Sequence, residues 1–111
     1  MSESTVLTNK IIDVIYRSGA FSWRAESSGI FDRKMGGYRT APKKGVSDIL
    51  AILPPSGRIA AIEVKIGKDK LSQEQEGFLK NIVYHGGFAF VAKDIESFEK
   101  WWYNEVTPTF T

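Results

Sequence analysis

The stretch that decides the fold is R-I-A-A-I-E-V-K-I-G, residues 58–67, an apolar run that contains an acid and an amine. Ile62 and Val64 alternate with Glu63 and Lys65, so an extended chain places the two charged side chains on one face and the two apolar ones on the other. An unpaired charge inside a buried strand is costly. The ordinary explanation is an edge strand with a solvent-facing Glu–Lys row, and the alternative is a functional site.

A second unexpected acid precedes the neighbouring apolar run. Asp48 comes directly before I-L-A-I-L, and P-P-S-G, residues 54–57, has the turn chemistry that joins two antiparallel strands in a hairpin. If the two residues flanking the turn pair, the same register sets Asp48 opposite Glu63, and such Cβ atoms lie about 4.5–5.5 Å apart. Two carboxylates that close repel each other unless a cation lies between them, and Mg²⁺ is usually held by one or two carboxylates. The register therefore favours a divalent-metal site.

A glutamine on the following helix is the third polar residue that bears on this site. Gln75 lies four residues before Leu79 and seven before Ile82, which places it on the inward face of a helix predicted over 72–84. The helix opens S-Q-E-Q, where Ser72 is the expected N-cap and Gln75 the third helical residue of a capping box. Two interpretations stay open: Gln75 only caps the helix, or it also faces the site and supports a metal-bound water or the substrate.

The remaining periodicities predict an α/β domain. We expect helices over 3–18, 72–84 and 95–104, strands over 21–26, 47–53, 58–66 and 88–92, and a loop over 27–46. The early strands form a meander, the strand over 47–53 reads as buried on both faces, and the later strand–helix–strand unit permits parallel pairing. The expected fold is a mixed central sheet flanked by helices, in one domain spanning residues 1–111.

Composition restricts the chemistry. The 111 residues are 42% hydrophobic and 25% charged, as in an ordinary globular protein, and no apolar run approaches the roughly 18 residues of a membrane span. No stretch resembles a signal peptide. The absence of cysteine excludes disulfides and thiolate metal sites, and a single histidine excludes an all-histidine site. Any metal would therefore be a hard cation with oxygen ligands.

Positive charge is concentrated in the first half of the chain. The segment 33–44 holds five cations and no anion: Arg33, Lys34, Arg39, Lys43 and Lys44, with Tyr38 among them. Its two glycines and one proline indicate a loop. Two interpretations stay open, a solvated loop or a contact with a polyanion such as the nucleic-acid backbone.

Three further residues have ordinary structural explanations. His85 follows a helix and precedes Gly86-Gly87, so we expect it to cap the helix C-terminus rather than to act as a general base. Trp101 and Trp102 share helical spacing with Phe98, so we expect them in the core or in an interface rather than stacked on bases.

Taken together, the motifs resemble a known family. G-V-S-D-I-L-A-I-L, A-I-E-V-K-I-G, K-L-S-Q-E-Q-E-G-F-L and H-G-G-F-A-F-V-A are similar to the VRR-NUC family of the PD-(D/E)xK nuclease superfamily, over roughly residues 19–96. The resemblance implies a restriction-endonuclease-like core and Mg²⁺- or Mn²⁺-dependent hydrolysis of DNA phosphodiester bonds.

The resemblance also implies roles for individual residues. Asp48 and Glu63 would be metal ligands, and the backbone carbonyl of Val64 would complete the inner shell. Lys65 would orient or activate the attacking water and offset phosphate charge. Gln75 would match the family's glutamine on the helix after the E-x-K strand.

The family often has a further glutamate on its first helix, and Glu3 is the acid near the matching distance. Stand-alone relatives act on branched DNA, so the expected substrate is a four-way (Holliday) junction. The expected assembly is a homodimer, and the aromatic C-terminal helix is one candidate for its interface. The alternatives are a flap, nick or general DNA nuclease, or a non-catalytic nucleic-acid-binding module. The resemblance places such a protein in the cytoplasm of a bacterial or phage-infected host.

Overall fold

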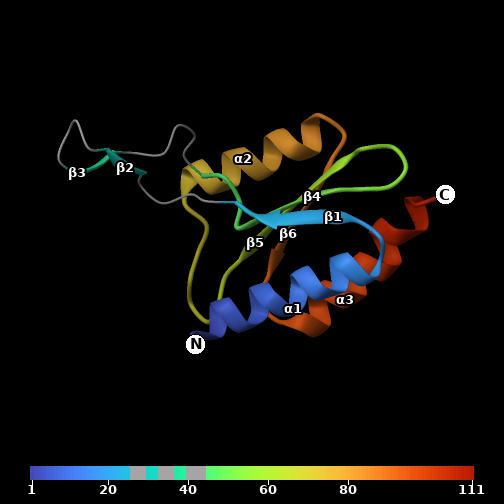
Figure 1. Ribbon diagram of the computed structural model, residues 1–111, viewed down its shortest axis with the longest axis horizontal. Helices are drawn as coiled ribbons and strands as arrows, with labels where there is room; N and C mark the ends of the chain where they lie inside the picture. The colour runs from blue at the N-terminus through green and yellow to red at the C-terminus, as the bar shows by residue number, and fades with distance from the viewer. Residues whose placement is uncertain (26–29, 33–36, 40–44) are drawn as a thin grey trace.

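The chain forms a mixed sheet with helices on both faces (Figure 1). The computed structural model describes residues 1–25, 30–32, 37–39 and 45–111. Its elements are α1 (Glu3–Arg17), β1 (Phe21–Arg24), β2 (Ile30–Asp32), β3 (Gly37–Arg39), β4 (Ile49–Ile52), β5 (Ile59–Val64), α2 (Gln73–Tyr84), β6 (Phe88–Ala92) and α3 (Ile95–Trp101), followed by a π-helical segment (Trp102–Val106) and a 3-10 turn (Thr107–Thr109).

The main sheet has the predicted mixed topology. Its strand order is β1-β4-β5-β6, with antiparallel pairing of β1 to β4 and of β4 to β5, and parallel pairing of β5 to β6. The hairpin register is the predicted one, because Ile49 pairs with Ile62 and Ile52 with Ile59. The turn closes with a bond from the Leu53 N–H to the Arg58 carbonyl, 2.8 Å. The segment 58–67 thus supplies the inner strand β5, which is paired on both edges.

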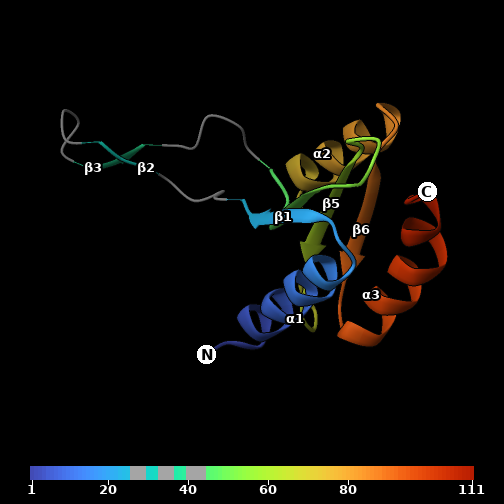
Figure 2. The same cartoon turned by 45° about the vertical axis from the view of Figure 1, so that its right-hand side comes forward.

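One face of the sheet carries the main hydrophobic core. The two helices α1 and α3 contact each other and cover this face (Figure 2). They bury apolar side chains from the alternate positions of the strands, as the period of two requires. The fully buried members include Ile11, Ile15, Ile49, Ile62, Phe98 and Trp102.

The opposite face is covered by α2, which connects the parallel strands β5 and β6 and contacts both (Figures 1 and 2). Ser72 caps the helix and His85 ends it, as expected. Leu79 is buried beneath the helix. Because alternation sends Ile62 and Val64 to the α1 side, Glu63 is directed to the α2 side.

The C-terminal aromatic side chains belong to this chain's own core. Phe98 and Trp102 are fully buried, and the Trp102 indole N–H donates to the Ser18 hydroxyl over 2.8 Å. Trp101 stacks on Phe90 with ring centroids 4.6 Å apart. These rings are therefore not free to stack on bases. The C-terminal helix was expected as one candidate for a dimer interface. Phe98 and Trp102 have no exposed surface to contribute to such an interface.

Several element ends differ from the sequence prediction: β1 ends at Arg24 rather than at 26, β5 spans Ile59–Val64 rather than 58–66, and α3 ends at Trp101, where the predicted helix to 104 continues as the π-helical segment. Three further differences are larger. The expected loop over 27–46 contains a separate antiparallel pair, β2 with β3, whose three-residue strands are too short to show a period of two. β4 begins at Ile49 rather than at Ser47, whose hydroxyl donates to the Ile49 carbonyl. Ile52 is 41% exposed, so this strand is not buried on both faces along its length. None of the helices in the described part of the chain is long and apolar enough to span a membrane.

Candidate active site

Asp48 is fixed in place by both strands that flank β4. Its Oδ2 accepts a hydrogen bond from the backbone N–H of Val64, 2.7 Å, beyond the point where the β4 ladder ends. Its backbone carbonyl accepts from the Ala25 N–H, 2.9 Å, which extends the pairing with β1. The Asp48 carboxylate thus accepts the bond from β5 that a backbone carbonyl would accept in a continuing strand. The register that pairs Ile49 with Ile62 places this acid across from Glu63, as predicted.

Glu63 is a buried carboxyl group with one unpartnered oxygen. Its residue is 1% exposed, and its Oε1 accepts a bond from the Nε2 of Gln75 over 3.4 Å. Its Oε2 is buried and receives no hydrogen bond from an N–H or hydroxyl group in the described structure, but the Asp48 side chain lies within hydrogen-bond reach of the Glu63 carboxyl group. A proton shared between the two acids, or a cation held between them, would satisfy this oxygen.

The electrostatics of the pair follow from this burial. Desolvation, followed by the neighbouring Asp48 carboxylate, raises the pKa of Glu63 to about 8, and the positive charge of Lys65 acts in the opposite direction. The carboxyl group is therefore largely protonated at neutral pH when no cation is present. A divalent cation between the two acids would replace that proton.

The backbone carbonyl of Val64 is directed to the side of β5 on which Asp48 lies. The Lys65 N–H bonds to the Ala92 carbonyl, 3.0 Å, so Lys65 directs its backbone groups to β6. Adjacent residues in a strand direct theirs to opposite edges, which sends the N–H and the C=O of Val64 toward Asp48. The side chain of Lys65 is half-buried and shares the strand face of Glu63.

Gln75 both caps α2 and reaches the site. Its backbone N–H donates to the Ser72 hydroxyl, 3.1 Å, and its side-chain Oε1 accepts from the Ser72 N–H, 2.9 Å, which completes the capping box. With the carbonyl end of the amide engaged in this way, the NH₂ end is turned to Glu63. The two interpretations of Gln75 are therefore compatible, and Ser72 sets the orientation of the amide.

Gly45 is a contributor that sequence reasoning did not identify. It has φ +80°, and a Cβ at this position would overlap the backbone of Glu74 and lie 2.8 Å from the Gln75 nitrogen. Only a glycine lets the segment before Asp48 pack this tightly on the first turn of α2. The contact holds the helix that carries Gln75 against the strand that follows Asp48. The only sequence feature that pointed to this packing role was the position of Gly45, three residues before Asp48.

The structure does not bring Glu3 into this site. Glu3 is exposed in the first turn of α1 and lines a groove with Ile66 and Lys93. Within residues 1–25 and 45–111 and the described β2 and β3, no three acidic, histidine or cysteine side chains form a group that could hold a metal. The expectation that Glu3 completes a cluster with Asp48 and Glu63 is therefore not met here.

The predicted basic contacts fall largely outside the described residues. Arg33, Lys34, Lys43 and Lys44 are outside them, and Tyr38 and Arg39 lie in β3, where only the backbone is described. The site is therefore built from Asp48, Glu63, Val64, Lys65 and Gln75, with support from Ser72 and Gly45.

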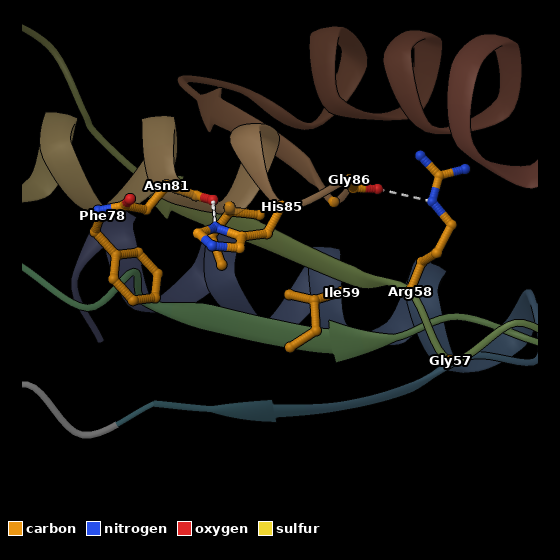
Figure 3. A pocket seen from close by; sticks show the side chains of 9 residues that line it. Gly57, Arg58, Ile59, Phe78, Asn81, His85 and Gly86 are labelled. Atoms are coloured by element: carbon orange, nitrogen blue, oxygen red, sulfur yellow. Dashed lines mark hydrogen bonds between the residues drawn. The ribbon is translucent and has the colours of Figure 1, made fainter.

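A second cleft lies at the other end of α2, remote from Gln75, with a volume of about 420 Å³ (Figure 3). There the His85 Nδ1 is 2.7 Å from the Asn81 carbonyl, and the Arg58 Nε donates to the Gly86 carbonyl, 2.8 Å. His85 thus acts as the expected helix cap. It is not part of the acid pair, because a whole helix separates it from Gln75.

Comparison with known proteins bears on the family and the fold of the chain. The sequence pattern of the VRR-NUC domain family matches residues 23–94. A solved structure described as a VRR_NUC domain superposes with a TM-score of 0.69 at 17% identity, over 95% of this chain and 99% of that one. No curated protein matches the chain.

Proposed function

The chain belongs to the VRR-NUC domain family, a nuclease-type domain, and on that premise we propose that it is a divalent-metal-dependent endonuclease. The observation that carries the proposal is the buried carboxyl group of Glu63 directly beside Asp48, with an Oε2 that receives no bond from an N–H or hydroxyl donor in the described structure. A purely structural Glu–Lys row would leave this carboxylate in solvent, where it needs no partner.

The donor set suits Mg²⁺ or Mn²⁺. Asp48, Glu63 and the backbone carbonyl of Val64 offer oxygen atoms only, and hard cations of this kind prefer oxygen. These three residues would hold the ion. When bound, the ion would lower the pKa of an attached water and neutralise charge at the phosphate.

The neighbouring residues have separate tasks in this proposal. Lys65 shares the face of Glu63, and its ammonium group would orient the attacking water and offset phosphate charge. Gln75 donates to Glu63 Oε1, which would leave Oε2 available to hold the ion. Because Ser72 engages the other end of the amide, Gln75 cannot turn its oxygen toward the carboxylate without losing the cap.

For the substrate we propose DNA, and four-way junctions in particular. The helices and main-sheet strands that the structure describes build the sheet and its two covering layers, so DNA recognition by this domain would depend on backbone charge and shape. The basic segment 33–44 comes only a few residues before Asp48 in the sequence. This nearness to the site suits a role in contacting DNA phosphates. A four-way junction has two strands to cut about a two-fold axis, and a homodimer would supply two sites.

A cleavage panel tests this function. The protein is incubated with labelled four-way junction, flap, nicked and linear DNA in Mg²⁺, in Mn²⁺ and in EDTA. We expect cleavage only with metal and mainly of the junction, and a loss of about 100-fold or more in Asp48→Asn and Glu63→Gln. The exposed carboxylate control Glu105→Gln keeps full activity.

Each part of the proposal has its own refutation. Cleavage that survives both substitutions overturns the metal-site assignment. Equal cleavage of linear duplex and junction overturns the junction preference and leaves a general nuclease. Binding of DNA without cleavage in either metal favours a non-catalytic module.

A further inference from the structure

The face of the sheet that carries Glu63 is only half covered by α2. This helix contacts β5 and β6, and β1 and β4 make up the other half of the sheet. Directly paired residues of antiparallel strands share a face. Leu50 pairs with Ala61, two residues before Glu63, and Trp23 pairs with Leu50, so these side chains all lie on one face. Those of β1 and β4 therefore share the face of the acid pair beside the helix that covers β5 and β6.

This half of the face carries large apolar side chains in solvent. Phe21 is 64% exposed, Trp23 is 38% exposed, and Ile52, the partner of Phe21, is also exposed. The rings of Phe21 and Trp23 meet edge to face with their centroids 5.5 Å apart. Together with the half-buried Leu50, these three residues form a surface that we call the aromatic strip. Neighbouring apolar side chains that stay in solvent are typical of a binding surface.

The aromatic strip begins one row of side chains away from the acid pair. The bond from the Ala25 N–H to the Asp48 carbonyl continues the β1–β4 pairing, so Ala25, Asp48 and Glu63 form one row across the sheet. Trp23 lies in the next row, and diagonal neighbours of this kind have Cβ atoms about 7–8 Å apart, within reach of an aromatic side chain. Phe21 lies one row further, about 7 Å along the strand. A strand of DNA with a phosphate at the acid pair would therefore extend over the strip.

The chemistry of the strip suits a nucleic-acid base rather than a phosphate. It has no charged side chain, and its two aromatic rings offer the kind of face on which bases of any sequence stack. Trp23 already packs against Phe21 and beside its cross-strand partner Leu50, so its ring is held in place before a ligand arrives. Such a fixed ring loses little conformational freedom when a base stacks on it.

We infer that the aromatic strip binds unpaired bases of the DNA strand whose phosphate lies at the acid pair, with Trp23 as the principal stacking residue. This inference rests on the proposed nuclease function and names the feature of the DNA that the site selects. A base must leave the duplex stack to reach the strip, which is costly in paired DNA and least costly where the base is already unpaired. Branch points supply such bases. The strip would therefore favour branched DNA over linear duplex.

The strip continues into the cleft at the far end of α2. Ile52 pairs with Ile59, and Ile59 lines that cleft together with Phe78 and His85. The rings of Phe78 and His85 project from α2 toward the strand that carries Ile59 (Figure 3). The surface thus leads from the row of the acid pair to the cleft. A single strand of several nucleotides can follow this path.

Fluorescence anisotropy of labelled DNA in EDTA, which prevents metal-dependent cleavage, tests the strip apart from the chemistry. Three DNA molecules are compared: a single strand, the same strand with abasic sites in place of its bases, and a linear duplex. The wild type should bind the normal strand about tenfold more tightly than the abasic strand, since stacking on an aromatic ring contributes about this factor or more for each base.

Two substitutions at one position separate stacking from general apolar contact. Trp23→Leu keeps an apolar side chain but removes the ring, so it should lose about tenfold in affinity for the normal strand and no longer distinguish it from the abasic one. Its affinity for linear duplex should stay within about twofold of the wild type, because paired bases do not reach the strip. Trp23→Phe keeps an aromatic face and should bind the normal strand within about threefold of the wild type.

Tyr16→Leu is the matched control, because it also removes an exposed aromatic ring, 77% exposed, but from α1 on the other face of the sheet. It should bind all three DNA molecules as the wild type does. Circular dichroism and sedimentation equilibrium should show that Trp23→Leu is folded and has the association state of the wild type.

Equal binding of the normal and abasic strands by the wild type overturns the inference, and this comparison depends on no variant. So does normal binding of the single strand by Trp23→Leu, an equal loss in Trp23→Phe or Tyr16→Leu, or an equal loss for linear duplex. A change of association state in Trp23→Leu would assign the strip to a second copy and also overturn the inference. Base-dependent binding without cleavage in Mg²⁺ or Mn²⁺ would refute the nuclease function and leave the strip's role standing.

Discussion

Replacing the buried acid Glu63 by glutamine should stabilise the metal-free protein, and the gain should depend on pH. The folded-state pKa of Glu63 is about 8, above its ordinary value of 4.5, so the folded state binds the extra proton between these values. The free energy of unfolding therefore falls as pH rises through this window. Glu63→Gln removes the titrating group, keeps an oxygen for Gln75 and offers an NH₂ to Asp48.

The size of the effect follows from the shift. At about 1.4 kcal/mol for each pKa unit, the wild type loses up to about 5 kcal/mol from this group between pH 4.5 and pH 8. The variant should therefore match the wild type near pH 5 and exceed it by about 3–5 kcal/mol near pH 8.5. For a chain of this size, that gain corresponds to at least about 10 °C in Tm.

Urea unfolding in EDTA, followed by circular dichroism from pH 5 to pH 9, measures this difference. Glu105→Gln, which removes an exposed carboxylate, should give a nearly flat difference over the same range. Adding Mg²⁺ should stabilise the wild type more than it stabilises Glu63→Gln. A Glu63→Gln difference that stays flat with pH, or a variant that is less stable than the wild type at pH 8.5, would refute the reasoning.

Two further perturbations test how the site is held. Gly45→Ala should destabilise the protein by about 3 kcal/mol or more, because backbone strain adds to overlap with Glu74. Gly57→Ala, at the same φ of +80° but with no neighbour near the new Cβ, should lose only about 1–2 kcal/mol in urea unfolding. Gln75→Glu keeps a capping-box residue but replaces the NH₂ donor to Glu63 by a third carboxylate, so we expect a lower Tm in EDTA at neutral pH and cleavage reduced at least about tenfold. Ser72→Ala should lower stability by about 1 kcal/mol, and a Gln75→Glu protein that cleaves normally would show that the amide has no role beyond the cap.

The hairpin and its acid pair could be predicted from sequence because local chemistry determines them. The P-P-S-G turn fixes the register, and the register alone places Asp48 across from Glu63. The position of α2 was also predictable, since its S-Q-E-Q start and apolar spacing agree with each other, although Leu79 is the one residue of this helix that is buried. The fold class followed from the order of these elements.

The remaining features depend on contacts between distant segments. The role of Gly45 comes from its packing on α2, and the capping-box pattern alone could not show that Gln75 also reaches β5. Strands of three residues, such as β2 and β3, leave no periodic signal. Helical spacing marked Trp102 as apolar, but only the packed structure shows that it is buried within its own chain.

The central claim is that Asp48 and Glu63 hold a divalent cation, and calorimetric titration of the metal-free protein with Mn²⁺ tests it most directly. Titrations at pH 7 in buffers of different ionisation enthalpy report binding and proton release together. Because the pKa of Glu63 is raised to about 8, we predict binding accompanied by release of most of one proton for each ion. Glu63→Gln should bind at least about tenfold more weakly and release no proton. Failure of the wild type to bind Mn²⁺, or binding that Glu63→Gln leaves unchanged, would contradict the account.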